Sequence, residues 1–353
     1  MTTPSPAVLA DRILEGTLDA CTPGDLELLL SDAVDVWAVM EAAGRVRRHR
    51  FGNRVHLCSI VNAKEGGCPE DCGFCSQSKA HATHARPGKF IPTQAAVEAS
   101  ARAATRHASA LGLVTATRGL SDGGPDLERM IEAVRAVREA GHTEAHGSFG
   151  FLSDEALDRL VEAGLTELNH NLETGRSYFS KIVTTHTYDE RIDTIRRAKA
   201  RGLRTCVGGI FGMGESVADR VELAVALREL DVDEVPLNFL VSIEGTRLAG
   251  AAPLPPMEML RIIAGFRLFL PRQNIFIAAG RTHLGQALPL IFAAGASGMM
   301  VGDFLTTPNR TVEDDLRMLD ELGLVPLRCG DVRPERPAST AGPAAGRRLP
   351  VVA

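Results

Sequence analysis

The pattern of a β-α-β unit is clearest in residues 204–240, which run RTCVGGIFGMGESVADRVELAVALRELDVDEVPLNFL. Residues 204–210 and 234–240 have the length and composition of strands, and residues 216–230 between them carry apolar side chains at helical spacing. A helix between two such strands indicates that the strands are parallel, because it carries the chain back to the edge where the first strand began.

The same alternation extends outward from this unit, from His56 to about Leu324. The predicted strands are residues 56–62, 111–116, 143–148, 167–172, 204–210, 234–240, 274–278 and 297–301. The predicted helices are residues 94–108, 125–140, 153–163, 188–201, 216–230, 256–269, 285–294 and 311–322. Eight alternating units predict an α/β fold that closes into a (βα)8 TIM-type barrel.

The barrel is predicted to occupy residues 51–325, between two extensions. Residues 1–50 are expected to form helices that cover one end of the barrel, and Thr22-Pro23 is a helix start signal. Residues 326–353 are predicted to be a flexible tail, because the segment from Arg333 onward is rich in Pro, Ala, Gly and Arg and offers little apolar surface to bury.

Composition indicates a soluble globular protein. The 353 residues are 44% hydrophobic and 24% charged, and the net charge of −5 gives no general attraction to nucleic acid or to an anionic membrane. The N-terminus has no basic segment followed by an apolar one, and no run approaches the roughly 18 apolar residues of a membrane span. We therefore expect a cytoplasmic protein with a small-molecule substrate.

The chain has an odd number of cysteines, seven in all. They are Cys21, Cys58, Cys68, Cys72, Cys75, Cys206 and Cys329. In a compartment that keeps thiols reduced, an odd set with three members close together favours metal ligation over a disulfide framework.

The segment GCPEDCGFC, just after the first predicted strand, places Cys68, Cys72 and Cys75 at the spacing C-x3-C-x2-C. Three thiolates can hold three irons of a cubane cluster and leave the fourth iron open to a small chelating molecule. A structural zinc site is the alternative. It needs a fourth protein ligand, and the nearest candidates, His81 and His84, complete no recognised zinc pattern.

Polar residues stand at the carboxyl ends of several predicted strands, where a TIM-type barrel builds its active site. Asn169, Asn171 and Glu173 close the fourth strand, Asn238 lies in the sixth and Arg281 follows the seventh. Asn169 and Asn171 are two residues apart and therefore face the same side, which is the barrel interior. Buried amides need hydrogen-bond partners, so a substrate-binding role is favoured over a purely structural one.

The cysteine triad, with an aromatic residue directly before its third cysteine, resembles the signature of the radical S-adenosylmethionine (SAM) superfamily. Further segments are similar to the biotin synthase family in the same order, over about residues 35–325. These segments are CPEDCGFCSQS from Cys68, NHNLET from Asn169, TTHTY from Thr184, GGIFGMGE from Gly208, VPLNFL from Val235 and LTTPN from Leu305.

The resemblance implies a [4Fe-4S] cluster on the three loop cysteines, with SAM chelated to its open iron. One electron from the cluster breaks the sulfonium bond, and the 5′-deoxyadenosyl radical takes a hydrogen from an unactivated carbon. By position, Phe74 and Ile210 pack the adenine, and Asn171 with Glu173 holds the ribose hydroxyls, although Ile210 also suits an ordinary core position. The cofactor carries the chemistry, so no other catalytic residue is implied.

The same resemblance implies a second cluster, [2Fe-2S], that lies deeper in the barrel, supplies sulfur and is held by three cysteines and one arginine. Cys206 and Arg281 match two of these ligands, whereas Val114 and His146 stand where the other two cysteines are expected. Valine cannot bind iron, but imidazole can replace thiolate. Our hypothesis is an auxiliary site of Cys58, His146, Cys206 and Arg281. The alternatives are Cys58 as a small core residue and His146 as a hydrogen-bonded barrel residue.

The leading hypothesis is an enzyme of the biotin synthase type that converts dethiobiotin to biotin by hydrogen abstraction and sulfur insertion. Asn169 and Asn238 are the predicted substrate ligands, because amides suit a small cyclic urea. Two alternatives stay open: a paralogue that performs radical chemistry without sulfur insertion, and a non-catalytic binding barrel, which the intact triad disfavours. The resemblance also implies an electron donor such as flavodoxin or ferredoxin, and a homodimer.

Overall fold

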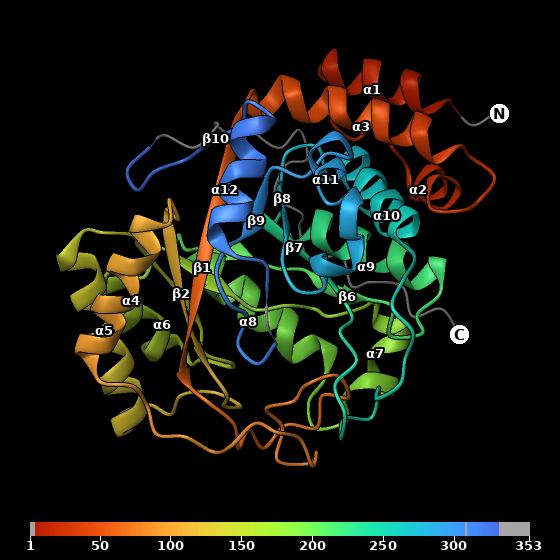
Figure 1. The fold of residues 1–353 in the computed structure, drawn as a ribbon. Coiled ribbons are helices and arrows are strands. Elements are labelled where there is room, and N and C mark those ends of the chain that lie inside the picture. The colour runs from red at the N-terminus through yellow and green to blue at the C-terminus, as the bar shows by residue number, and fades with distance from the viewer. Residues whose placement is uncertain (1–3, 308, 332–353) are drawn as a thin grey trace.

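Parallel strands close into a barrel inside a shell of helices in the computed structural model, which describes residues 4–307 and 309–331 (Figure 1). The barrel strands are β1 (Arg54–Lys64), β2 (Ala110–Thr115), β3 (Glu144–Ser148), β4 (Glu167–Asn169), β5 (Arg204–Cys206), β6 (Gly209–Phe211), β7 (Glu234–Phe239), β8 (Asn274–Ile277) and β9 (Gly298–Met300). Neighbours pair in parallel, and β9 pairs with β1 to close the ring. The predicted TIM-type fold is confirmed.

The predicted strand 204–210 is divided into β5 and β6. Its middle passes so close to β7 that a Cβ on Gly208 would lie 1.9 Å from the carbonyl oxygen of Pro236. Pro236 also has no N–H to donate to a neighbouring strand. The ladder is therefore interrupted there, and the pairing with β7 resumes at Gly209.

The outer shell contains the predicted helices. They are α4 (Thr93–Thr105), α5 (Pro125–Ala140), α6 (Asp154–Ala163), α8 (Tyr188–Ala200), α9 (Val217–Glu229), α10 (Pro256–Phe269), α11 (Leu290–Ala293) and α12 (Val312–Glu321). Helix α5 is representative, because it begins with Pro125 in its first turn and buries Leu127, Ile131 and Val134 on one face. It ends at Gly141, whose φ of 67° is left-handed.

Two shell elements differ from the predictions. The predicted helix 285–294 is a 3₁₀ segment, η1 (Arg281–Ala287), followed by the short α11. The chain breaks the α-helical path at Gly285, with φ of 52°, and Pro289 precedes α11. A further helix, α7 (Arg176–Ile182), was not predicted, because seven residues carry too little periodicity to recognise.

Three N-terminal helices, α1 (Pro6–Leu14), α2 (Pro23–Leu29) and α3 (Val36–Phe51), lie at the end of the barrel where β1 begins (Figure 1). Helix α2 starts at the predicted signal, since Thr22 and Asp25 form a reciprocal capping box. Helix α3 packs on α10 and α1. These helices leave the opposite end of the barrel, where the strands terminate, to the loops.

The last described residues continue to contact the barrel beyond position 325. A short strand, β10 (Val325–Pro326), pairs with the start of β1, and Leu327 is buried. Arg54 forms an ion pair with Asp331. Of the predicted tail 326–353, Pro326, Leu327 and Asp331 therefore contact the fold, and residues 332–353 lie outside the described residues.

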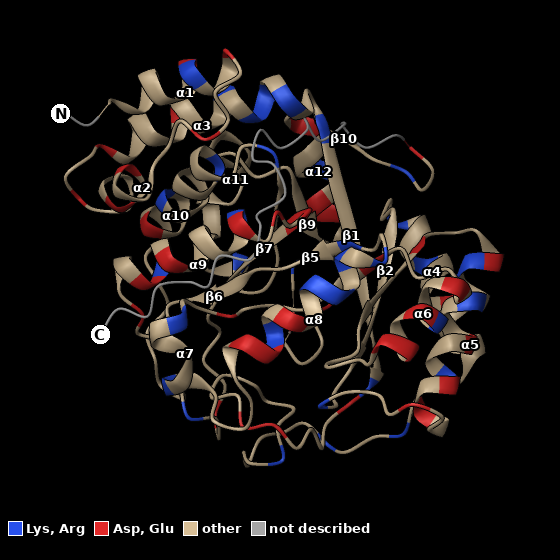
Figure 2. Ribbon diagram, turned by 180° about the vertical axis from the view of Figure 1, so that it is seen from behind, with Lys and Arg blue, Asp and Glu red and all other residues tan. Residues whose placement is uncertain are grey.

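Basic and acidic side chains are interspersed over the outer helices (Figure 2). None of the described helices has the length and apolar character of a membrane span.

Candidate active site

The three predicted cluster ligands lie on the loop that follows β1, at the carboxyl end of the barrel. Backbone bonds fold this loop back on itself: Cys68 N–H donates to Gln77 at 3.0 Å, and Cys75 N–H donates to Cys72 at 2.9 Å. All three thiols are free and partly buried. Burial raises the pKa of Cys72 to about 12 and that of Cys75 to about 11, so a metal must displace their protons.

The segment between α7 and α8 anchors the cysteine loop. Asp71 accepts hydrogen bonds from the backbone N–H groups of Thr184, at 2.9 Å, and Thr185, at 3.2 Å. Glu70 accepts from Arg118 at 2.9 Å and also contacts His186. The TTHTY segment that carried part of the family resemblance therefore positions the loop.

Both histidines of the zinc alternative contact backbone carbonyl groups. One ring nitrogen of His81 bonds the carbonyl oxygen of Cys75 at 2.9 Å, and one of His84 bonds that of Thr306 at 3.1 Å. The ligand atoms around one metal ion lie close together. Among the described residues, the loop thiols and these imidazoles form no group of three or more whose ligand atoms all lie within 4.8 Å of one another.

One cavity of about 420 Å³ runs from the cysteine loop into the barrel. Apart from Cys72 and Arg281, every predicted site residue lines it. These are Cys58, Cys68, Phe74, Cys75, His146, Asn169, Asn171, Glu173, Cys206, Ile210 and Asn238. The cavity thus joins the loop at its mouth to the predicted auxiliary residues at its floor.

The residues predicted to hold adenosine lie near the mouth. Glu173 has a left-handed φ of 68°, and its Oε2 is buried without a hydrogen-bond partner among the described residues. Burial raises the pKa of Glu173. Asn171 accepts at 3.1 Å from Gly208 N–H. An orphaned buried oxygen needs a donor, and a ligand hydroxyl supplies one, so the site fits a ribose.

The two predicted substrate amides already have partners. Asn169 Nδ2 donates to Cys206 Sγ at 3.2 Å. Asn238 donates to the carbonyl of Gly209 at 3.2 Å and accepts from Ala279 N–H at 3.1 Å. Asn238 therefore joins β6 and the end of β8 as well as lining the cavity.

The cavity floor is a compact cluster of ionisable groups, which we call the floor cluster: the partly buried Cys58 and the buried His146, Glu167, Cys206 and Glu234. His146 Nδ1 lies 3.0 Å from Glu167. Burial opposes charge on His146, but Glu167 and its other partners outweigh this and hold the pKa of His146 well above its usual range. Burial, reinforced by Glu167 and Glu234, holds the pKa of Cys206 well above its usual range.

Glu167 and Glu234, the first residues of β4 and β7, were not among the predicted site residues. A signal was present, because the alternation that places Asn169 and Asn171 in the barrel interior places Glu167 there too.

Sequence comparison assigns the chain to a family. Residues 66–227 match the model of the Radical SAM superfamily, and residues 236–325 match that of the Biotin and Thiamin Synthesis associated domain. A biotin synthase of Geotalea daltonii is 45% identical over 91% of this chain and 97% of that protein. A biotin synthase of Geobacter sulfurreducens is also 45% identical, over 92% of this chain and 98% of that protein. The chain belongs to the biotin synthase family.

Solved structures share the fold of this biotin synthase family member at lower identity. Methylornithine synthase superimposes with a TM-score of 0.76 at 23% identity, over 91% of this chain and 97% of that one. A hydrogenase maturase of Carboxydothermus hydrogenoformans superimposes with a TM-score of 0.77 at 15% identity, over 94% of this chain and 82% of that one. The chain is a radical SAM enzyme, and this superfamily implies a [4Fe-4S] cluster with SAM.

In this biotin synthase family member, Arg281 pairs with an acidic side chain and is not among the residues that line the cavity. Its guanidinium forms a two-pronged ion pair with Asp315 of α12, and both side chains are 0% exposed. The chain turns at Gly280, with φ of 79°, directly before Arg281. Phe276 and Ala278 are the residues of this region that line the cavity.

Proposed function

We propose that this chain converts dethiobiotin, or a closely similar cyclic urea, to biotin by radical hydrogen abstraction and sulfur insertion. One observation carries the proposal: a three-cysteine loop opens onto a cavity of about 420 Å³ in a chain 45% identical to biotin synthases over nearly its whole length. A cavity of this size suits a small substrate beside SAM.

Each part of the cavity has a proposed task. When bound at Cys68, Cys72 and Cys75, a reduced [4Fe-4S] cluster supplies the electron that cleaves SAM. Glu173 offers its orphaned oxygen to a ribose hydroxyl. Phe74, which lines the cavity mouth, supplies apolar surface for the adenine.

The polar walls deeper in the barrel orient the substrate. Asn169 and Asn238 line the cavity below the adenosine residues and present amides to it. The surrounding protein keeps water from the reacting carbon. Flavodoxin or ferredoxin is the proposed electron donor, in the cytoplasm, and a homodimer is the proposed assembly.

A second candidate is a radical enzyme that does not insert sulfur. The floor cluster favours it, because Val114 and His146 occupy two expected cysteine positions and Arg281 lies outside the cavity. The cluster that donates sulfur in the first candidate therefore lacks most of its expected ligands.

One assay distinguishes the two candidate functions. Anaerobically reconstituted protein is given dithionite, SAM and dethiobiotin, and 5′-deoxyadenosine and biotin are quantified by mass spectrometry. Both products support biotin formation, whereas 5′-deoxyadenosine alone supports the second candidate. Neither product, from protein with a reducible cluster, contradicts both. A biotin-requiring strain rescued by the wild-type chain gives an independent readout.

A further inference from the structure

The floor cluster does not fit the second [2Fe-2S] cluster that the family resemblance implies. That cluster needs three thiolates and an arginine, whereas the floor offers the thiols of Cys58 and Cys206 and lacks Arg281. It offers two carboxylates instead, on Glu167 and Glu234, which are 2% and 3% exposed. The donor set is therefore of a different chemical kind.

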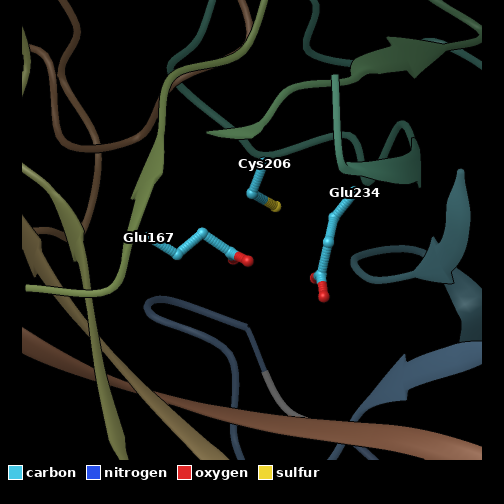
Figure 3. Close-up of side chains that lie close together, drawn as sticks. All are labelled: Glu167, Cys206 and Glu234. Carbon is cyan, nitrogen blue, oxygen red and sulfur yellow. The ribbon is translucent and has the colours of Figure 1, made fainter. Parts of the chain in front are cut away.

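The donors converge at one point. Glu167, Cys206 and Glu234 come from β4, β5 and β7, and one ligand atom of each lies within 4.8 Å of the others. Figure 3 shows their side chains turned toward one another inside the barrel. The ligand atoms around one Zn²⁺ or similar ion lie roughly 3.3–3.8 Å apart, so small side-chain rotations suffice to close the site.

Surrounding groups hold each donor in place. Asn169 donates to Cys206 Sγ at 3.2 Å, and His146 Nδ1 contacts Glu167 at 3.0 Å. Partners of this kind, which orient the ligands and tune their charge, are typical of metal centres. The hydrogen bond from Asn169 stabilises the thiolate form of Cys206. It does not neutralise the charge of Glu167 or Glu234.

A buried ion-pair network is the competing explanation. His56 Nδ1 lies 3.1 Å from Glu234, and Arg204 Nε lies 3.4 Å from Glu167, so cations already compensate both carboxylates in part. Such a network does not explain why a thiol shares the same space. A thiolate with two carboxylates is a donor set that Zn²⁺ and Fe²⁺ accept.

We propose that Glu167, Cys206 and Glu234 bind one divalent transition-metal ion, Fe²⁺ or Zn²⁺, at the cavity floor, in place of a second iron–sulfur cluster. Three protein ligands leave a fourth position directed to the cavity, as in catalytic metal sites. Hydrosulfide is the ligand for that position, and this assignment alone rests on the proposed sulfur insertion. His146 is a positioning residue that orients Glu167.

The test uses the full-length chain with Cys68, Cys72 and Cys75 all replaced by Ala, so that the loop cannot bind metal. Co²⁺ added anaerobically is expected to bind one per chain with a thiolate-to-cobalt absorption band. Cys206→Ala is expected to abolish the band, and Glu167→Gln or Glu234→Gln to weaken binding by about tenfold or more. Cys329→Ala, an exposed thiol, is the matched control. Hydrosulfide is expected to shift the band.

A folded triple variant that binds no Co²⁺, or a band that survives Cys206→Ala, overturns the proposal. If the triple variant does not fold, the ratio of metal to acid-labile sulfide in reconstituted wild-type protein tests the proposal instead. It is expected to hold metal in excess of acid-labile sulfide, and this excess is expected to disappear in Cys206→Ala. Matched metal and sulfide in wild type indicate an iron–sulfur cluster and overturn the proposal. None of these measurements needs SAM cleavage. A protein that fails to cleave SAM therefore contradicts the proposed function without contradicting the metal site.

Discussion

Asp71 accepts a 2.9 Å hydrogen bond from the backbone N–H of Thr184 and thereby joins the cysteine loop to the segment that precedes α8. The carboxylate also contacts the hydroxyl and N–H of Thr185. Although burial opposes the charged form, bonds from Thr184 and Thr185 lower the pKa of Asp71 to about 2. A charged acceptor thus fixes the loop between two of its cluster ligands.

Replacement of this anchor is expected to impair cluster assembly. Asp71→Ala removes the acceptor for several bonds and frees the loop, so iron bound after anaerobic reconstitution is expected to fall to less than about half of wild type. Iodoacetamide is expected to modify the metal-free loop thiols faster. Asp320→Ala, an exposed change on α12, is the control. Unchanged iron content and labelling rate in Asp71→Ala would contradict the anchoring role.

Loss of one loop thiol is expected to abolish SAM cleavage. Cys72→Ala leaves too few thiolates for the cubane, so 5′-deoxyadenosine formation under dithionite is expected to fall to background. Cys329→Ala, which alters an exposed cysteine, is expected to retain wild-type turnover. Substantial cleavage by Cys72→Ala would disprove the ligand assignment.

Glu173 is expected to control SAM binding. Glu173→Gln keeps the size of the side chain but weakens the acceptor offered to the ribose. A lost bond to a charged group costs about 1.5–3 kcal/mol, so KM for SAM is expected to rise roughly tenfold to a hundredfold. Steady-state 5′-deoxyadenosine kinetics give KM and kcat separately. The exposed Glu162→Gln is the control, and an unaltered KM in Glu173→Gln would exclude the contact.

Arg281 is expected to stabilise the fold and not to bind metal. Arg281→Ala removes the two-pronged partner of the buried Asp315 and leaves it the more distant Arg310, 3.8 Å away, which costs about 3–5 kcal/mol in the free energy of unfolding. The double variant Arg281→Met with Asp315→Leu is expected to recover most of this loss. Denaturant unfolding measures stability, and a metal count on the folded double variant is expected to match wild type. A lower metal count there would restore Arg281 to the ligand set.

The local pattern of the chain was enough to predict the barrel and the cysteine loop. Strand and helix periodicity extend over many residues in each unit, and the thiol spacing lies within one short segment, so neither depends on distant contacts. Helix α7 and the division of strand 204–210 escaped prediction. The first is too short for periodicity, and the second depends on how closely Gly208 approaches Pro236 of another strand.

The contents of the barrel floor depended on three-dimensional packing. Strand alternation specifies that Glu167 faces inward, but only the pairing of β4, β5 and β7 brings it to Cys206 and Glu234. Arg281 also depends on a distant contact, because its buried partner Asp315 lies 34 residues further along the sequence, on α12. The sequence alone specifies the barrel fold and the cysteine loop, because both depend on patterns within short segments. The tertiary structure decides which side chains meet at the barrel floor. Side chains from separate strands become neighbours through the register of strand pairing and the closure of the barrel, and no single segment encodes either.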